Sequence, residues 1–191
     1  MANVTIFGSG NMGTALDEVL AAGGASIDHI NHTDTQAKIT GDVVILAVPY
    51  PALEEIVERY GEQLADKVVV DITNPLDFTT FDSLVVPSGS SAASELAAAL
   101  PTARVVKAFN TTLAATLRAK SIGPNPTVVL VAGDDADAKD VLIEAIQAGG
   151  VEAVDVGPLR RSRELEAIGF LELTLAANAK ISWAGGFAIV R

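Results

Sequence analysis

The sequence predicts an α/β fold built on a mostly parallel sheet with helices on both faces. Two observations carry this prediction. Short apolar runs rich in β-branched residues recur along the chain, and most are followed by a stretch whose apolar residues repeat at helical spacing. The first strand and the first helix are joined by a glycine-rich turn, GSGNMG, at residues 8–13. Strands that alternate with helices form parallel sheets, because a parallel connection needs a crossover.

Composition limits the classes of protein open to this chain. Its 191 residues are 49% hydrophobic, and we expect one dinucleotide-sized domain over residues 1–191 with a C-terminal extension from about residue 158. No apolar run is long enough to span a membrane and no signal-peptide pattern is present, so we expect a cytoplasmic protein without a membrane partner. Zero cysteines and two histidines predict no metal site, and the net charge of −11 disfavours nucleic acid as a partner.

Each element is predicted from its local pattern. Strands are expected at residues 3–7, 26–31, 42–48, 67–72, 104–108, 126–132 and 151–156. Helices are expected at residues 11–22, 51–64, 91–100, 133–148 and 159–179. Only about ten residues separate the second strand from the third, which predicts a shortened second crossover. Residues 181–190 predict a glycine loop and a last strand, so that the C-terminal extension consists of a helix and a strand.

The glycine-rich turn has the context of a dinucleotide-binding loop, since it follows a strand and opens a helix. In this pattern Gly8 permits the tight turn, Gly10 lets the backbone approach a pyrophosphate, and Gly13 lets helix and strand pack closely. The amides at the start of the helix then receive the phosphates. We therefore predict a Rossmann-type NAD(P)-binding fold, and a glycine turn without a ligand is the alternative. The predicted cofactor-binding residues of this loop are Gly8, Ser9, Gly10, Asn11, Met12 and Gly13.

The residues after the second strand are expected near the adenosine ribose, about 20 residues beyond the last glycine. His32 and Thr33 suit a phosphate on the ribose 2′ oxygen, whereas Asp34 suits a free ribose diol. A polar loop without a ligand is the third interpretation. We place His32 and Thr33 in the cofactor site, and the conflict with Asp34 leaves NADP and NAD both open.

The turns after the third and fourth strands are expected to border the same ligand, because ligands bind beyond the C-terminal ends of strands in open parallel sheets. Ala47, Val48 and Pro49 follow the third strand, where they border the adenine or a ribose or only begin the next helix. Thr73 and Asn74 follow the fourth strand. Asn74 precedes a proline, which favours extended geometry and a side-chain amide that faces the nicotinamide or the substrate; capping of a turn is the alternative.

The fifth strand is followed by polar groups at the same edge. Lys107 either neutralises a ligand anion or polarises a carbonyl, or else pairs with Asp71 or a helix end. Phe109 and Trp183 offer apolar faces to a planar ring. The predicted substrate-side residues are Asn74, Phe109, Asn110 and Trp183. No residue is assigned as catalytic, because hydride transfer between two ring systems needs alignment and exclusion of water more than a protein acid or base.

Five segments resemble the NADP oxidoreductase family that uses the deazaflavin coenzyme F420. They are TIFGSGNMGTAL, VVILAVPY, VVVDITNP, VVKAFNT and RELEAIGFLELTLA, and together they span most of the chain. The resemblance implies NADP as the cofactor and a flavin, a deazaflavin or another small molecule as the acceptor. The family has a Ser/Thr-Arg pair after the second strand; Thr33 matches its first member, and Asp34 stands where the cation is expected.

The helix at residues 159–179 is apolar nearly all round, which exceeds what contact with one sheet face requires. This pattern predicts a homodimer. The leading functional hypothesis is an NAD(P)H-dependent oxidoreductase, and the alternative is a non-enzymatic NADP(H)-binding redox sensor or regulatory module.

Overall fold

The structure of the protein is a computed structural model that describes residues 2–34 and 36–190. Seven strands form one sheet in the order β2-β1-β3-β4-β5-β8-β9. These strands are β1 (Asn3–Phe7), β2 (Ser26–Ile30), β3 (Val43–Leu46), β4 (Val68–Asp71), β5 (Arg104–Lys107), β8 (Val128–Gly133) and β9 (Glu152–Gly157). Neighbouring strands are parallel except for β5 and β8, which pair antiparallel. The predicted mostly parallel α/β fold is confirmed.

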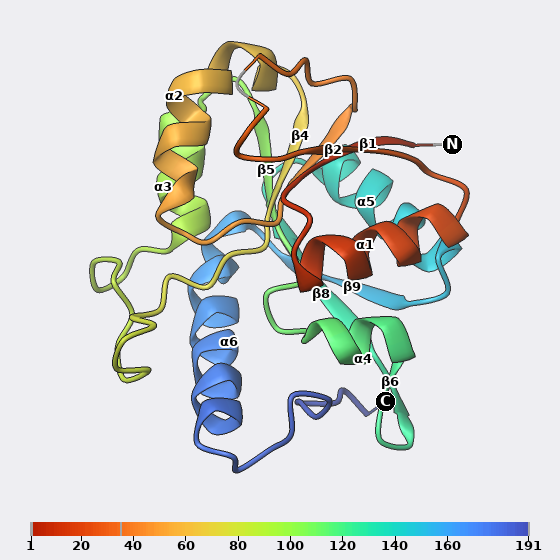
Figure 1. Ribbon diagram of the computed structural model, residues 1–191, viewed down its shortest axis with the longest axis vertical. Coiled ribbons are helices and arrows are strands. Elements are labelled where there is room, and N and C mark those ends of the chain that lie inside the picture. The colour runs from red at the N-terminus through yellow and green to blue at the C-terminus, as the bar shows by residue number, and fades with distance from the viewer. Residues whose placement is uncertain (1, 35, 191) are drawn as a thin grey trace.

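Helices cover both faces of this sheet (Figure 1). On one face α2 and α3 lie side by side, and on the other α1 packs near α5 and α4. The helices are α1 (Asn11–Ala22), α2 (Ala52–Leu64), α3 (Ala92–Ala99), α4 (Ala114–Ala119), α5 (Ala136–Ala148) and α6 (Ser162–Ala177). A single 3₁₀ turn (Leu159–Arg161) leads into α6, and a short hairpin of β6 (Ser121–Ile122) and β7 (Asn125–Pro126) follows α4.

Successive side chains along a strand point alternately into two hydrophobic cores, one on each face of the sheet. Val43 and Ile45 belong to the core beneath α1 and α5, whereas Val44 and Leu46 belong to the core beneath α2 and α3. All four residues are at most 2% exposed. This burial explains the continuous apolar runs in the sequence, since a strand covered on both faces has no solvent-facing side.

Two local features differ from expectation. The hairpin β6–β7 was not foreseen, because each of its strands contains only two residues. The strand expected in the C-terminal tail is wrong: residues 178–190 form no strand among the described residues. The tail instead returns from α6 toward α4 and the hairpin (Figure 1), where Gly186 lies close to Ile122 of β6 and Glu172 of α6. The shortened second crossover is present, since no helix lies between β2 and β3 in the described part of the chain.

Two further features are absent from the described residues. No helix in this part of the chain is both long and apolar enough to cross a membrane. No group of three or more His, Cys, Asp or Glu side chains there is arranged to hold a metal ion.

Candidate functional site

The glycine loop has the geometry that a dinucleotide loop requires. Gly8 ends β1 with φ +96°, and a Cβ at this position would collide with the carbonyl oxygen of Ala47. A Cβ at Gly13 would collide with the carbonyl oxygen of Gly8. Helix α1 begins at Asn11 without a side-chain cap or an acidic residue in its first turn, as far as the described residues show. Its first amides are therefore open to an anion.

A cavity of about 390 Å³ lies on the α2 side of the glycine loop, and we call it the loop cavity. Gly8, Ser9 and Gly10 form one wall, and Asn31 and His32 from the end of β2 form another. The Ser9 hydroxyl donates a hydrogen bond of 2.7 Å to the side-chain oxygen of Asn31, so the two walls are tied together. The cavity is therefore bounded by the two segments that the sequence assigned to pyrophosphate and adenosine.

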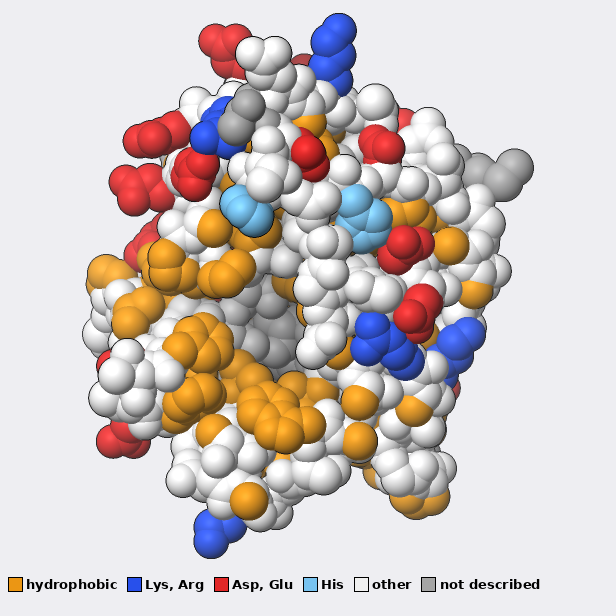
Figure 2. Space-filling model, viewed as in Figure 1, with side chains coloured by type: hydrophobic (Ala, Val, Ile, Leu, Met, Phe, Trp, Pro, Cys, Tyr) orange, Lys and Arg blue, Asp and Glu red, His pale blue; other side chains and the backbone are white. Residues whose placement is uncertain are grey.

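A second cavity of about 620 Å³ lies at the C-terminal ends of β4 and β5, and we call it the edge cavity. It shares Gly10, Ala47, Val48 and Pro49 with the loop cavity. Figure 2 shows hydrophobic side chains gathered around a hollow in the face that also carries the two histidines. The predicted residues that line the edge cavity are Gly10, Asn11, Met12, Gly13, Ala47, Val48, Pro49, Thr73, Asn74, Phe109, Asn110 and Trp183.

Three polar atoms in the wall of the edge cavity are buried without a hydrogen-bonding partner among the described residues. They are Thr73 Oγ1, Asn110 Oδ1 and Thr112 Oγ1. Each of these residues is at most 5% exposed. A buried polar atom without a partner is costly, so three of them in one cavity wall fit a polar ligand that binds here. The carboxamide of a nicotinamide ring has the matching donor and acceptor groups.

Two asparagines from neighbouring strand ends form a reciprocal pair in the same wall. Asn74 Nδ2 donates to the carbonyl oxygen of Asn110 at 2.8 Å, and Asn110 Nδ2 donates to Asn74 Oδ1 at 2.9 Å. Asn110 also donates to the carbonyl oxygen of Leu165 in α6 at 2.9 Å. A Cβ at Gly169 of α6 would collide with Asn74 Oδ1, so glycine is needed for this close approach. Helix α6 therefore fixes the orientation of the asparagine pair.

The structure corrects the prediction that Lys107 contacts the ligand. Lys107 is 0% exposed, and its ammonium lies 2.8 Å from Asp71 Oδ2 and 2.8 Å from Glu166 Oε1. It also donates to the carbonyl oxygen of Thr73 at 2.5 Å. These three acceptors saturate its donors, so the pairing with Asp71 that was the alternative interpretation is the one observed.

Glu166 completes this buried cluster from α6. Its carboxylate accepts from the amide of Ala92 at 2.9 Å and from that of Ala93 at 3.3 Å, at the start of α3. Burial raises the pKa of Glu166 above its ordinary value, although Lys107 and the Ala92 amide oppose the shift. The cluster ties β4, β5, α3 and α6 together directly behind the edge cavity.

Two other predicted residues are placed differently from expectation. Phe109 borders the edge cavity, but it is 0% exposed and packs in the hydrophobic core, so its ring is not free to stack on a ligand. Its backbone has φ +62°, which a phenylalanine adopts only under constraint. Thr33 is exposed and lines neither cavity. His32 lines the loop cavity, and Trp183, 55% exposed, lines the edge cavity.

Sequence reasoning missed several residues that the fold brings to the site. Arg59 of α2 lines the loop cavity, and Arg118 of α4 lines the edge cavity, where it donates to the carbonyl oxygen of Asn11 at 3.0 Å. Phe78 and Leu173 add apolar surface to the edge cavity. The exposed-looking Phe78 in a long loop was a usable signal, whereas nothing in the local pattern distinguishes the two arginines from ordinary surface cations.

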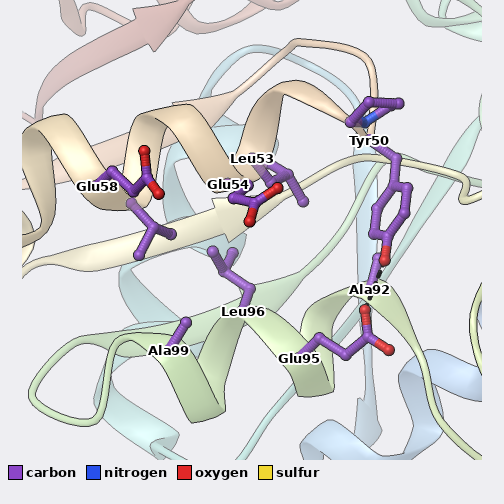
Figure 3. Close-up of a pocket in the computed structure, with 10 residues that line it drawn as sticks. Tyr50, Leu53, Glu54, Glu58, Ala92, Glu95, Leu96 and Ala99 are labelled. Atoms are coloured by element: carbon purple, nitrogen blue, oxygen red, sulfur yellow. Dashed lines mark hydrogen bonds between the residues drawn. The ribbon is translucent and has the colours of Figure 1, made fainter.

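A third hollow lies between α2 and α3 (Figure 3), and Tyr50 is the one lining residue that it shares with the edge cavity among the described residues. Glu54, Glu58 and Glu95 line it, and the Tyr50 hydroxyl donates to Glu95 at 2.6 Å. Burial, followed by this hydrogen bond, raises the pKa of Tyr50 to about 12, so the hydroxyl keeps its proton. Three carboxylates disfavour a phosphate-bearing ligand, and the candidate site is therefore the pair of cavities at the glycine loop.

The fold and this pair of cavities define the class of Rossmann-type NAD(P)-dependent oxidoreductases. A family model described as "NADP oxidoreductase coenzyme F420-dependent" matches residues 26–75. The F420-dependent NADP reductase of Methanocaldococcus jannaschii is 36% identical over 155 residues, which cover 79% of this chain and 69% of that protein. The chain belongs to the coenzyme F420-dependent NADP oxidoreductase family.

Solved structures agree with this assignment at the level of the fold. A protein of Arthrobacter sp. FB24, provisionally assigned as an F420-dependent NADP reductase, matches over 100% of both chains with a TM-score of 0.85 and 22% identity. A hypothetical protein of Sinorhizobium meliloti is 30% identical, with a TM-score of 0.69 over 83% of this chain and 86% of that one.

Proposed function

We propose that this protein transfers a hydride between NADP(H) and a planar deazaflavin-like acceptor, with the adenosine half of the cofactor in the loop cavity and the nicotinamide in the edge cavity. The relatives named F420-dependent NADP reductases support both the cofactor and the acceptor. The nicotinamide and the acceptor supply the redox chemistry when bound. The chain has to bind the two rings, align them and exclude water.

The observation that carries the proposal is the continuity of the two cavities across the glycine loop. They share Gly10 and residues 47–49, so one elongated ligand can cross the N-terminus of α1 and present a ring at each end. Among the described residues, three buried polar atoms without partners lie in the wall of the edge cavity and none lies in the wall of the loop cavity, which supports binding of a carboxamide in the edge cavity. A cavity of about 620 Å³ leaves room for a second ring beside the first.

The roles proposed for the residues follow from this placement. The glycine loop and the first turn of α1 hold the pyrophosphate, with His32 at the adenosine end. Residues 47–49 pack against the middle of the cofactor. Thr73 and the Asn74–Asn110 pair orient the carboxamide, and Trp183 covers the acceptor ring.

The decisive experiment follows the oxidation of NADPH with coenzyme F420, a flavin mononucleotide or a ferric chelate as the acceptor. We expect the fastest turnover with coenzyme F420. With coenzyme F420 or the flavin, the hydride carries two electrons to one ring and one proton from solvent completes the reduction, so NADPH and acceptor are consumed one for one. A ferric ion accepts one electron, so two ferric ions would be reduced for each NADPH. Tight binding of NADPH without turnover on any acceptor would overturn the enzyme proposal in favour of a redox sensor.

Thr112 offers a sharper test of the nicotinamide position. Its buried hydroxyl has no partner within the described part of the chain, so Thr112→Val should leave the stability of the free protein unchanged or slightly raised. If the hydroxyl binds the cofactor, the variant should bind NADPH about fivefold to tenfold more weakly. Thr116→Val is the matched control, because the Thr116 hydroxyl already donates to the Leu113 carbonyl at 2.9 Å. The control should lose stability and keep its affinity for NADPH.

We also propose a homodimer in which the apolar face of α6 meets a second copy. Ile168 and Leu171 on this helix are 37% and 50% exposed. Apolar side chains clustered on one exposed helix face favour association. Sedimentation of the wild type and of Leu171→Glu tests this proposal: we expect a dimer that the charge converts to a monomer, and a monomeric wild type would refute it.

A further inference from the structure

The loop after β2 uses its acidic residue for its own fold. The backbone amide of Asn31 donates to Asp34 Oδ2 at 2.8 Å, and the amide of Asp34 donates to the carbonyl oxygen of Asn31 at 2.9 Å. The Asp34 carboxylate therefore closes a turn, and Asp34 is not among the residues that line the loop cavity. A carboxylate held in this way is not presented to the diol of an adenosine ribose.

Helix α2 fixes this arrangement from behind. The Tyr60 hydroxyl donates to the carbonyl oxygen of Asp34 at 2.7 Å. Tyr60 is 4% exposed, and its ring packs edge-on against Phe7 with centroids 5.1 Å apart. The loop conformation is thus anchored to the core of the protein, so the orientation of Asp34 is a property of the fold.

The residue before Tyr60 supplies the positive charge that the loop lacks. Arg59 lines the loop cavity, and its guanidinium lies 2.7 Å from Glu55 Oε1, one helical turn earlier. Both side chains are substantially exposed, and exposed pairs at this spacing contribute little to stability. A guanidinium has five N–H donors, so Arg59 can retain Glu55 and bind a phosphate as well.

The charges around the loop cavity leave Arg59 as the side chain best placed to bind a phosphate there. Arg59 is the one Lys or Arg among the described residues that line it, and Glu55 is the one acid. The net charge of −11 means that the overall field repels anions, so a phosphate must be held by a local cation. The N-terminus of α1 serves the pyrophosphate, which leaves a second phosphate in this cavity dependent on Arg59 with help from His32.

We infer that Arg59 selects NADP over NAD by binding the phosphate on the ribose 2′ oxygen, and that Asp34 does not select for NAD. This inference rests on the proposed function, since it assumes that adenosine occupies the loop cavity. The cation expected in the loop after β2 is thereby replaced by one from the neighbouring helix.

Binding measured by calorimetry tests the inference without any turnover. The probes are NADPH and NADH, together with the fragments 2′,5′-ADP and 5′-AMP, which differ only in the 2′-phosphate. Arg59→Gln should weaken binding of NADPH and 2′,5′-ADP about tenfold to a hundredfold, because it removes a charge-assisted hydrogen bond. Binding of NADH and 5′-AMP should change less than about twofold, since neither carries the phosphate.

Two further variants make the test specific. Glu55→Gln removes the competing carboxylate and should tighten NADPH binding about twofold to fivefold, as expected for loss of one exposed like charge. Arg104→Gln is the matched control: Arg104 lies at the N-terminal end of β5, whereas both cavities lie at the C-terminal ends of the strands, and it donates to the Asp66 carbonyl at 3.0 Å. It removes the same charge and should leave all four affinities unchanged.

The outcomes separate this inference from the function on which it rests. A wild-type protein that binds neither NADPH nor NADH overturns the proposed function. A wild-type protein that binds NADPH, with an Arg59→Gln variant that binds it equally well, overturns the role of Arg59 alone. Equal weakening of NADPH and NADH also overturns it, because the side chain would then act on a part that both cofactors share. Weaker binding of NADH by Asp34→Asn, with binding of NADPH unchanged, would overturn the role assigned to Asp34.

Discussion

Replacement of Lys107 by methionine separates a structural role of this lysine from a role in ligand binding. Methionine keeps most of the volume and removes the charge. Asp71 and Glu166, which are 0% and 1% exposed, would then face one another without the ammonium between them. Two uncompensated carboxylates in the interior are a severe defect, because water cannot replace the lost partner.

The size of the loss follows from the cost of protonating the carboxylates. The variant can remain folded by binding a proton at one of them. At pH 7.5 this protonation costs about 4 kcal/mol, since the pH is about three units above an ordinary carboxyl pKa and each unit is worth about 1.4 kcal/mol. The estimate agrees with the roughly 3–5 kcal/mol lost when one partner of a buried pair is removed. Near pH 5 the same proton costs about 1 kcal/mol.

Denaturation by urea at pH 5 and at pH 7.5 measures this difference. The folded variant has a raised carboxyl pKa and holds more protons than its unfolded chain, so its stability falls as the pH rises through this window. Lys139→Met is the control. Lys139 pairs with Asp155 at 2.7 Å, but Asp155 is 46% exposed and can be hydrated instead, so a loss of at most about 1 kcal/mol is expected. A Lys107→Met variant with wild-type stability and weakened NADPH binding would refute the reasoning and restore Lys107 as a ligand contact.

Three further perturbations test separate features. Burial raises the pKa of Glu172 from an ordinary 4.5 to about 7, and the nearby backbone amide of Phe187 opposes this shift. Both carboxylate oxygens of Glu172 are buried without a hydrogen-bonding partner of good geometry among the described residues. The folded protein therefore binds more protons than the unfolded chain between these pH values, and thermal unfolding should report a stability loss of roughly 3 kcal/mol as the pH rises from 4.5 to 7. Glu172→Gln should abolish that slope, and a slope equal to that of the wild type would exclude Glu172 as its source. Gly169→Ala should cost about 1–3 kcal/mol in urea unfolding because its Cβ would collide with Asn74 Oδ1, and a more stable variant would show that α6 is free to shift. Tyr60→Phe should cost about 1 kcal/mol and speed hydrogen exchange at Asp34 by loss of the 2.7 Å hydrogen bond; protection equal to that of the wild type would contradict the anchoring of this loop.

The sheet was predictable because its strands bury both faces. A run such as Val43 to Leu46 carries no polar residue, and its length and glycine or proline boundaries distinguish it from a helix. The C-terminal tail gave no comparable signal. Its apolar residues Phe187, Ile189 and Val190 are 36% exposed or more, so the apolar composition of residues 181–190 does not reflect burial against the sheet.

The candidate site was predictable where the backbone defines it and less so where side chains do. The glycine loop, residues 47–49 and Asn74 with Asn110 all line the cavities, since strand ends in a parallel sheet converge on one edge. The backbone of Lys107 also lies at this edge of the sheet, but its side chain points into the interior, where it pairs with Glu166. That partner lies on α6, and no local pattern links the two positions in the sequence.

Helix α6 connects these observations. Leu165, Glu166 and Gly169 lie on one face of the helix, and together they contact the ends of β4 and β5. The Leu165 carbonyl accepts from Asn110, the Glu166 carboxylate binds Lys107, and the missing side chain of Gly169 leaves space for Asn74. These three residues of α6 do not themselves line the edge cavity, although Asn74 and Asn110 do. A substitution on this face therefore changes the position of the asparagine pair without removing any group that touches a ligand. Within the segment RELEAIG, the pattern that resembles the family is thus explained by the requirement to hold the strand ends in register with one another.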